Sequence, residues 1–209
     1  MSRVRADDYG DKRQAILDAA AVLFAQAGYA NVKMTDIARA CGASKSMLYH
    51  YFSKKEDVLF EIMRDQIQEY LDATREVVAR AAPPERRLRD FVAMWIAKAT
   101  QARARVTVLM YEYKFLSRRQ RGMVGDVARR LIDTVAGLVG EVNPGIAKVG
   151  PAHVRTCTLL LFGLLNWTEV WYRTTGPLGP EEMAALIYGL FLEGVRSIAP
   201  DARGRAARP

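Results

Sequence analysis

The stretch Thr35–Phe52, TDIARACGASKSMLYHYF, decides the fold of this chain. Its leading threonine predicts a helix start, because the hydroxyl can cap free backbone N–H groups. Gly42 interrupts that helix, and a second short helix is expected to begin after Ser44. A helix-turn-helix needs a small residue where its helices cross and a turn that tolerates an unusual backbone. Ala38 and Gly42 meet these two demands, so the stretch predicts a helix-turn-helix.

The second short helix is expected to bury one side and expose the other. Ile37 and Leu48 sit at offsets that turn both side chains into a shared core. The outer face then carries polar, basic and aromatic residues, namely Lys45, Ser46, Tyr49 and His50. Such side chains suit phosphate oxygens and the base edges of a DNA major groove. The alternative is that residues 35–52 form a helical hairpin with a solvated face.

A longer ordered series of residues resembles the DNA-binding signature of TetR-type repressors. It comprises Thr35-Asp36-Ile37-Ala38, Gly42, Ser44 to Phe52, Lys54-Lys55-Glu56 and Leu59, and it extends back through Ile16 to Ala20, Leu23-Phe24 and Gly28-Tyr29. The resemblance covers about residues 12–60. It implies DNA contacts from Thr35, Ser44, Lys45, Ser46, Tyr49, His50 and Lys55. Ser46 departs from the glycine often found at its position, so a hydroxyl contact is expected there.

The rest of the chain predicts an all-α protein of about nine helices, because no segment alternates with period two over strand length. Beyond the helix-turn-helix, helices are expected near 11–28, from 56 to the proline pair at 83–84, and near 85–102, 104–116, 120–141, 151–173 and 180–198, with Asn143-Pro144-Gly145 as a turn. We expect residues 1–55 to form a three-helix DNA-binding domain and residues 56–200 a larger helical domain that binds an effector and dimerises. Residues 201–209 are expected to form a disordered tail. Arg3 and Arg5 fit either a DNA-contacting arm or a basic terminus with no role.

Composition narrows the class of protein. A chain of 209 residues is too short for a large multidomain enzyme. The formal net charge of +8 and a sequence pI near 9.7 favour a polyanionic partner, whether nucleic acid, membrane surface or anionic metabolite. Cys41 and Cys157 predict no disulfide framework, and without an apolar leader we expect a cytoplasmic protein. The longest apolar run, 158–165, falls short of the ~20 residues that cross a bilayer.

The last two expected helices carry apolar stripes too wide for a solvated surface. The stripes consist of Leu159, Leu160, Gly163, Leu164 and Trp167 on one helix and of Leu186, Leu190, Phe191, Gly194 and Val195 on the other. The family resemblance implies that these helices pair with their symmetry mates in a homodimer, and a two-fold operator calls for such a dimer. The alternative is that both stripes face the core of their own domain.

Aromatic side chains and arginines are the main candidates for an effector pocket, because ligand sites are mostly apolar with a few polar groups. Residues 161–173 resemble a helix of the TetR-type regulators that answer to acyl-CoA thioesters, and the arginine-rich region 80–130 offers partners for phosphates. The alternative for this region is a solvated face. The candidate ligand residues are Met110, Tyr111, Arg118, Arg121, Phe162, Asn166, Trp167, Trp171 and Arg173.

The expected mechanism is a repressor whose two recognition helices stand about 34–36 Å apart until a ligand changes that spacing. The long helix that begins at Glu56 is expected to transmit the ligand-induced change from the pocket to the recognition helix. An efflux-pump regulator that answers to hydrophobic compounds is an alternative, and a protein-binding adaptor is another. An enzyme is disfavoured, because His50 and His153 are the only histidines and no phosphate-binding or metal-type motif is present. No cofactor or metal is expected.

Overall fold

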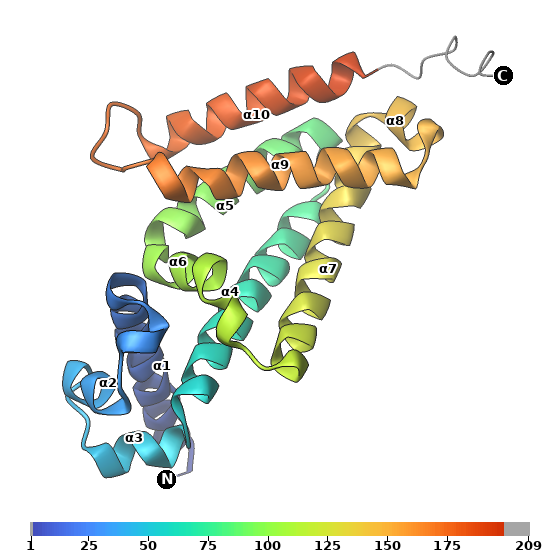
Figure 1. The fold of residues 1–209 in the computed structure, drawn as a ribbon. Coiled ribbons are helices and arrows are strands. Elements are labelled where there is room, and N and C mark those ends of the chain that lie inside the picture. The colour runs from blue at the N-terminus through green and yellow to red at the C-terminus, as the bar shows by residue number, and fades with distance from the viewer. Residues whose placement is uncertain (1, 199–209) are drawn as a thin grey trace, which may run out of the picture. The chain divides into compact units, whose positions relative to one another are not determined.

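The computed structural model describes the backbone of residues 2–198 and the side chains of residues 9–198 (Figure 1). Within this part the chain is helical and has no strand. The expected tail 201–209 and the side chains of Arg3 and Arg5 lie outside the described residues. No helix in the described part is long and apolar enough to cross a membrane.

The chain forms two compact units, and each is described by itself. Among the described residues, the first contains residues 2–69 and 102–127, and the second contains residues 70–101 and 128–198. This division differs from the expected one at residue 55, because a later segment, residues 102–127, packs with the N-terminal helices. The assignment of DNA binding to residues 1–55 remains a functional prediction.

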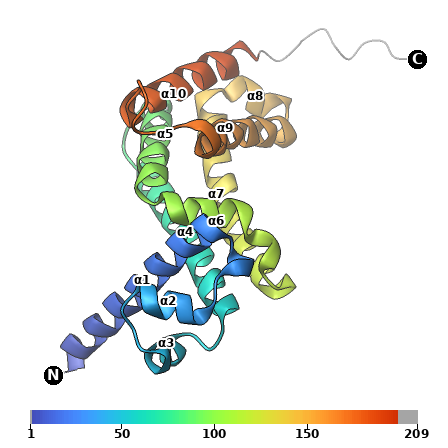
Figure 2. The same ribbon diagram turned by 60° about the vertical axis from the view of Figure 1, so that its left-hand side comes forward.

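The first unit is built around α1. It contains α1 (Ser2–Ala27), η1 (Tyr29–Asn31), α2 (Met34–Ala40), α3 (Lys45–Tyr51), the start of α4 (Lys55–Val78), α6 (Arg103–Tyr111), η2 (Tyr113–Phe115) and the start of α7 (Arg118–Val142). α1 packs against α2 and α6, and α2 packs against α3 (Figure 2). The apolar stripe of α1 is buried at Ile16, Leu17, Ala20 and Phe24, which fixes the frame on which the short helices rest.

The second unit is a helical layer structure. It contains the end of α4, α5 (Pro84–Gln101), the end of α7, α8 (Pro144–Val149), α9 (Pro151–Trp171) and α10 (Pro180–Ser197). α5 packs against α9 and α10, which also run side by side (Figures 1 and 2). Its core includes an aromatic cluster in which the Trp95 ring lies 4.1 Å from that of Tyr70 and 5.1 Å from that of Phe162.

Three predicted boundaries were wrong. α1 begins at Ser2 rather than near residue 11. Thr35 does not cap α2, because the helix begins at Met34 and Asp36 accepts the N–H of Lys33 at 2.9 Å. The expected turn at Asn143 is the start of α8: the Asn143 side chain accepts the N–H groups of Gly145 and Ile146, and burial of Ile146 stabilises this short helix.

Candidate nucleic-acid interface

The turn between α2 and α3 has the backbone that the sequence predicted. Gly42 adopts a φ of +66°, a left-handed conformation that glycine reaches without the cost other residues incur. The N–H of Ala43 donates to the carbonyl of Ala38 at 2.9 Å across this turn. The bend is therefore closed by backbone hydrogen bonds, and it sets where α3 starts.

α3 is held by a cap at its start and by one buried side chain. The Ser44 hydroxyl accepts the N–H of Met47 at 3.1 Å, as an N-cap does. Leu48 is fully buried, and so is Ile37 of α2, which confirms the predicted shared core. A seven-residue helix has too few internal hydrogen bonds to be stable alone. The cap and the buried leucine therefore fix the rotation of α3 about its axis.

That rotation leaves Lys45, Ser46, Tyr49 and His50 exposed together. The Lys45 ammonium lies 5.9 Å from the centre of the Tyr49 ring, and the first turn of α3 has no acidic residue. This face offers an ammonium, two hydroxyls and an imidazole with no carboxylate on the same turn. Such groups donate hydrogen bonds to phosphates and base edges.

The other three residues of the predicted DNA-contact set lie differently. Thr35 is exposed in the first turn of α2, where its hydroxyl is accessible. Ser44 is exposed, but its oxygen serves as the cap. Lys55 is turned inward: its ammonium donates to the carbonyls of Tyr29 and Val32, each at 2.7 Å. The Lys55 ammonium therefore already stabilises the carbonyls around η1, and a phosphate contact from Lys55 stays a prediction.

Tyr9 belongs to this surface, and the sequence analysis missed it. Its ring stacks on Tyr51 with centroids 4.5 Å apart and meets His50 edge-on at 6.4 Å. The signal was present, because Tyr9, Arg13 and Ile16 continue the three-to-four spacing of α1 toward its N-terminus. The extension of α1 thus supports the end of α3.

An ion-pair cluster joins α1 to α4 within the first unit. Arg13 donates to Asp65 at 3.1 Å and also pairs with Glu61, which Arg64 contacts as well. Burial by itself would lower the pKa of Arg13, but its hydrogen bond to Asp65 and the two carboxylate charges raise that pKa. Beside η1, burial and then the Glu56 carboxylate raise the pKa of the Tyr29 phenol. The Arg13 cluster and Tyr29 therefore have a structural role within the first unit.

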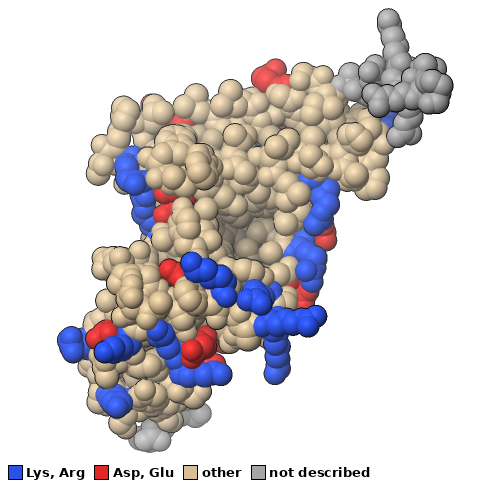
Figure 3. All heavy atoms as spheres, in the orientation of Figure 1, with Lys and Arg blue, Asp and Glu red and all other residues tan. Residues whose placement is uncertain are grey.

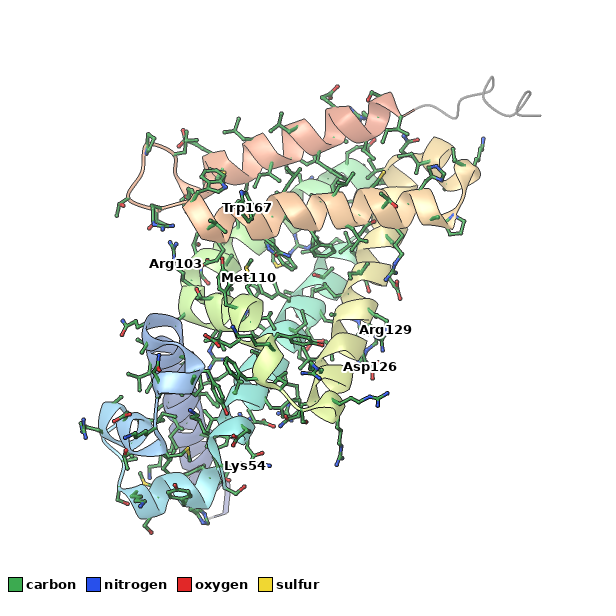
Figure 4. All side chains as sticks on the ribbon, viewed as in Figure 1. Lys54, Arg103, Met110, Asp126, Arg129 and Trp167 are labelled. Atoms are coloured by element: carbon green, nitrogen blue, oxygen red, sulfur yellow. The ribbon has the colours of Figure 1, made fainter. Side chains whose placement is uncertain are left out.

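The candidate ligand residues divide between the two units. In the first unit Met110 is half-buried, Tyr111 and Arg118 are exposed, and the Arg121 guanidinium donates to the carbonyl of Leu116 at 2.9 Å (Figure 4). In the second unit Phe162 is buried against the aromatic cluster, and Asn166 is half-buried. Arg173 is exposed and donates to the carbonyl of Tyr172 at 3.0 Å. Two of the three arginines considered for phosphates therefore hold backbone carbonyls.

Trp167 and Trp171 were expected among the pocket walls, but neither is enclosed within the described part of the chain. They are 63% and 53% exposed, whereas Phe162 on the same helix is buried. The 3.6-residue period explains the difference, because residues 162 and 171 fall on opposite faces of one helix. α9 is apolar on both faces, so the pattern alone did not say which face is buried.

The exposed side of α9 is part of a wide apolar surface, which we call the α9–α10 face. It consists of Leu159, Leu160, Leu164, Trp167, Val170 and Trp171 on α9 and Leu186, Leu190 and Ile198 on or after α10. Leu190 is 71% and Leu160 62% exposed, and both line a groove of about 360 Å³ between the helices. Figure 3 shows few charged side chains over these two helices. Phe191 and Val195 are buried instead, so part of the predicted α10 stripe faces the unit's own core.

Gln66 is a second polar residue that the sequence analysis missed. It lies on α4 in the first unit, is fully buried, and neither its amide oxygen nor its amide nitrogen has a hydrogen-bond partner among the described residues. A buried amide without a partner is destabilising. The position therefore calls for a polar partner.

Comparisons with known proteins agree on one family. Residues 16–62 match the family model of the bacterial regulatory proteins of the tetR family, and residues 81–195 match the tetracyclin repressor-like C-terminal domain. The transcriptional repressor KstR2 of Rhodococcus jostii is 28% identical over 92% of this chain and 96% of its own length.

Two solved structures extend this similarity to the whole fold. A TetR-family regulator from Bordetella parapertussis has a TM-score of 0.81 and 32% identity over 87% of this chain and 94% of its own. The structure of AibR with isovaleryl coenzyme A and operator DNA has a TM-score of 0.75 and 25% identity over 86% and 97%.

Proposed function

The chain belongs to the TetR family of bacterial regulatory proteins, and from this premise we propose that it represses transcription by inserting α3 into an operator as a homodimer until a small-molecule effector releases it. Regulators of this family are DNA-binding transcription factors with a helix-turn-helix, rather than enzymes. The observation that carries the proposal for this chain is the shared exposed face of Lys45, Ser46, Tyr49 and His50 on a capped α3.

DNA binding by the exposed face of α3 is tested with a selected DNA duplex. A duplex is selected by the wild-type protein from a random-sequence pool, and binding is measured by fluorescence anisotropy. Lys45→Ala and Tyr49→Ala should each weaken binding by about 10- to 100-fold, because each removes a base or phosphate contact worth about 1–3 kcal/mol. Lys148→Ala, which removes an exposed charge from α8, is the matched control. Unchanged binding by both α3 variants contradicts the assignment.

The α9–α10 face supports the homodimer. Monomeric proteins rarely expose contiguous apolar patches larger than a few hundred Å². A two-fold dimer buries the same patch of both chains and gives the reading helices the symmetry of a palindromic operator, with a spacing of about 34–36 Å. We therefore assign Trp167 and Trp171 to the dimer contact and remove them from the ligand set.

We propose an acyl-CoA thioester as the effector. The AibR structure, which contains isovaleryl coenzyme A, supports this choice by its similarity. Of the arginines considered, Arg118 is exposed with no hydrogen bond or ion pair among the described residues, so it is free to meet a phosphate. Gln66 supplies a buried amide that a polar ligand atom would satisfy.

The effector is tested by calorimetry with isovaleryl-CoA, a long-chain acyl-CoA and free coenzyme A. Binding of a thioester should release the selected duplex, because a ligand shifts the equilibrium only by its preference for the conformation that cannot hold DNA. Gln66→Leu should weaken thioester binding and leave DNA binding intact. Failure of every acyl-CoA to bind contradicts this effector class, and release by an apolar compound alone favours the efflux-type alternative.

The coupling we propose runs along α4. Glu61 and Asp65 of this helix hold Arg13 of α1, and α1 contacts α2 and the end of α3. A shift of α4 is therefore passed to the reading helix through ion pairs and stacked rings.

A further inference from the structure

A groove of about 790 Å³ lies in the first unit beside the exposed face of α3. One wall is the end of α3 and the turn into α4, including Tyr49, His50 and Lys54. The other wall is the start of α7, including Arg119 and Met123. Since Tyr49 and His50 belong to both surfaces, the groove continues the exposed face of α3.

Most charged groups in this groove already have partners. Arg13 pairs with Glu61, and Asp57 accepts the Ser53 hydroxyl at 2.7 Å. Lys54 and Arg119 are exposed, and neither side chain has a hydrogen bond or ion pair in the described part of the chain (Figure 4 labels Lys54). The first turn of α7 has no acidic residue, so the helix end adds to the positive charge of Arg119. The groove thus holds two cations without an ion-pair partner on opposite walls, and its lining carries three cations, Arg13, Lys54 and Arg119, against the two carboxylates Asp57 and Glu61.

We propose that this groove binds the sugar–phosphate backbone of the DNA that flanks the base pairs read by α3, with Lys54 and Arg119 each contacting a phosphate. The inference rests on the proposed function, because it needs DNA on α3. Charge favours this occupant: two free cations on a mostly polar lining suit a polyanion. Continuity favours it as well, because Tyr49 and His50 of the exposed α3 face line the same groove as Lys54.

A contact of this kind has a measurable signature. A phosphate contact carries no sequence information, and its loss reduces the salt slope of binding by about 0.9 per contact. Arg119→Ala should therefore weaken binding of the selected duplex by about 3- to 10-fold at 0.15 M salt and lower the slope by about 1. Preference over a scrambled duplex should stay unchanged. The double variant with Lys54→Ala should lower the slope by about 2.

The matched control is Arg130→Ala, which removes an exposed arginine from a later position of α7 that does not line the groove. A second arm uses a duplex shortened to the base pairs that depend on α3. On it, wild type and Arg119→Ala should bind alike, because the flanking backbone is gone. Circular dichroism checks that the variants fold.

The outcomes separate this inference from the function it rests on. If Arg119→Ala behaves like Arg130→Ala, or keeps its defect on the short duplex, the groove does not contact the DNA backbone and the inference fails, although Lys45→Ala still weakens binding. If Lys45→Ala and Tyr49→Ala bind normally, the proposed function itself fails. A lower slope for Arg119→Ala on the long duplex alone supports the inference.

Discussion

The outer face of α3 and the α9–α10 face are both exposed, but they differ in chemistry. The α3 face presents Lys45, Ser46, Tyr49 and His50, which water solvates well in the absence of a partner. The α9–α10 face presents leucines and tryptophans, among them Leu190 at 71% exposure. The α3 face suits a transient partner, whereas the α9–α10 face suits a permanent one. The charge and the exposed apolar area of the two faces therefore distinguish a transient interface from a permanent one in the chain alone.

The largest expected effect is on the α9–α10 face. Leu190→Glu would bury a carboxylate in the proposed dimer, at a cost of several kcal/mol, so the dimer should weaken by more than about 100-fold. Sedimentation equilibrium measures the change. Val149→Glu, an equally apolar-to-acidic change on α8 outside the face, should leave the dimer intact. A Leu190→Glu protein that dimerises as well as wild type would remove the distinction between the two faces.

A smaller effect is expected beneath the α3 face, at Lys55. Lys55→Met removes a cation from the carbonyls of Tyr29 and Val32, which should lower the free energy of unfolding by about 2 kcal/mol. Urea denaturation at one fixed protein concentration measures it. Lys54→Met, at the preceding position and with no side-chain partner among the described residues, should change stability by less than about 0.5 kcal/mol. Equal stability of the two variants argues against the framework role of Lys55.

The smallest effect concerns the bend that aims α3. Gly42→Ala meets open space but a φ of +66°, so it should cost about 1 kcal/mol and lower the Tm by about 2–4 °C. Gly137→Ala, in the middle of α7 with open space around it, should act in the opposite direction, because alanine favours helix. A Tm that rises in both variants would show that the left-handed turn is not required.

The amino-acid sequence was sufficient to predict the local parts of this protein. The all-α class, the bend at Gly42, the Ser44 cap and the buried Leu48 all depend on residues within one or two helical turns, where capping and 3.6-residue spacing act directly. Four of the proposed DNA contacts were predictable for the same reason, because the rotation of α3 follows from its own pattern.

Contacts between residues that are distant in the sequence could be known only from the folded chain. The sequence predicted Lys55 as a DNA contact, but the fold brings the carbonyls around η1 to its ammonium. α9 is apolar on both sides, so only its packing on α5 and α10 decided that Phe162 is buried and Trp167 exposed. Lys54 and Arg119 lie far apart in the sequence. They line the same groove only because the fold brings the start of α7 to the turn into α4. Periodicity describes one helix at a time, and burial is set by the neighbours that the fold supplies.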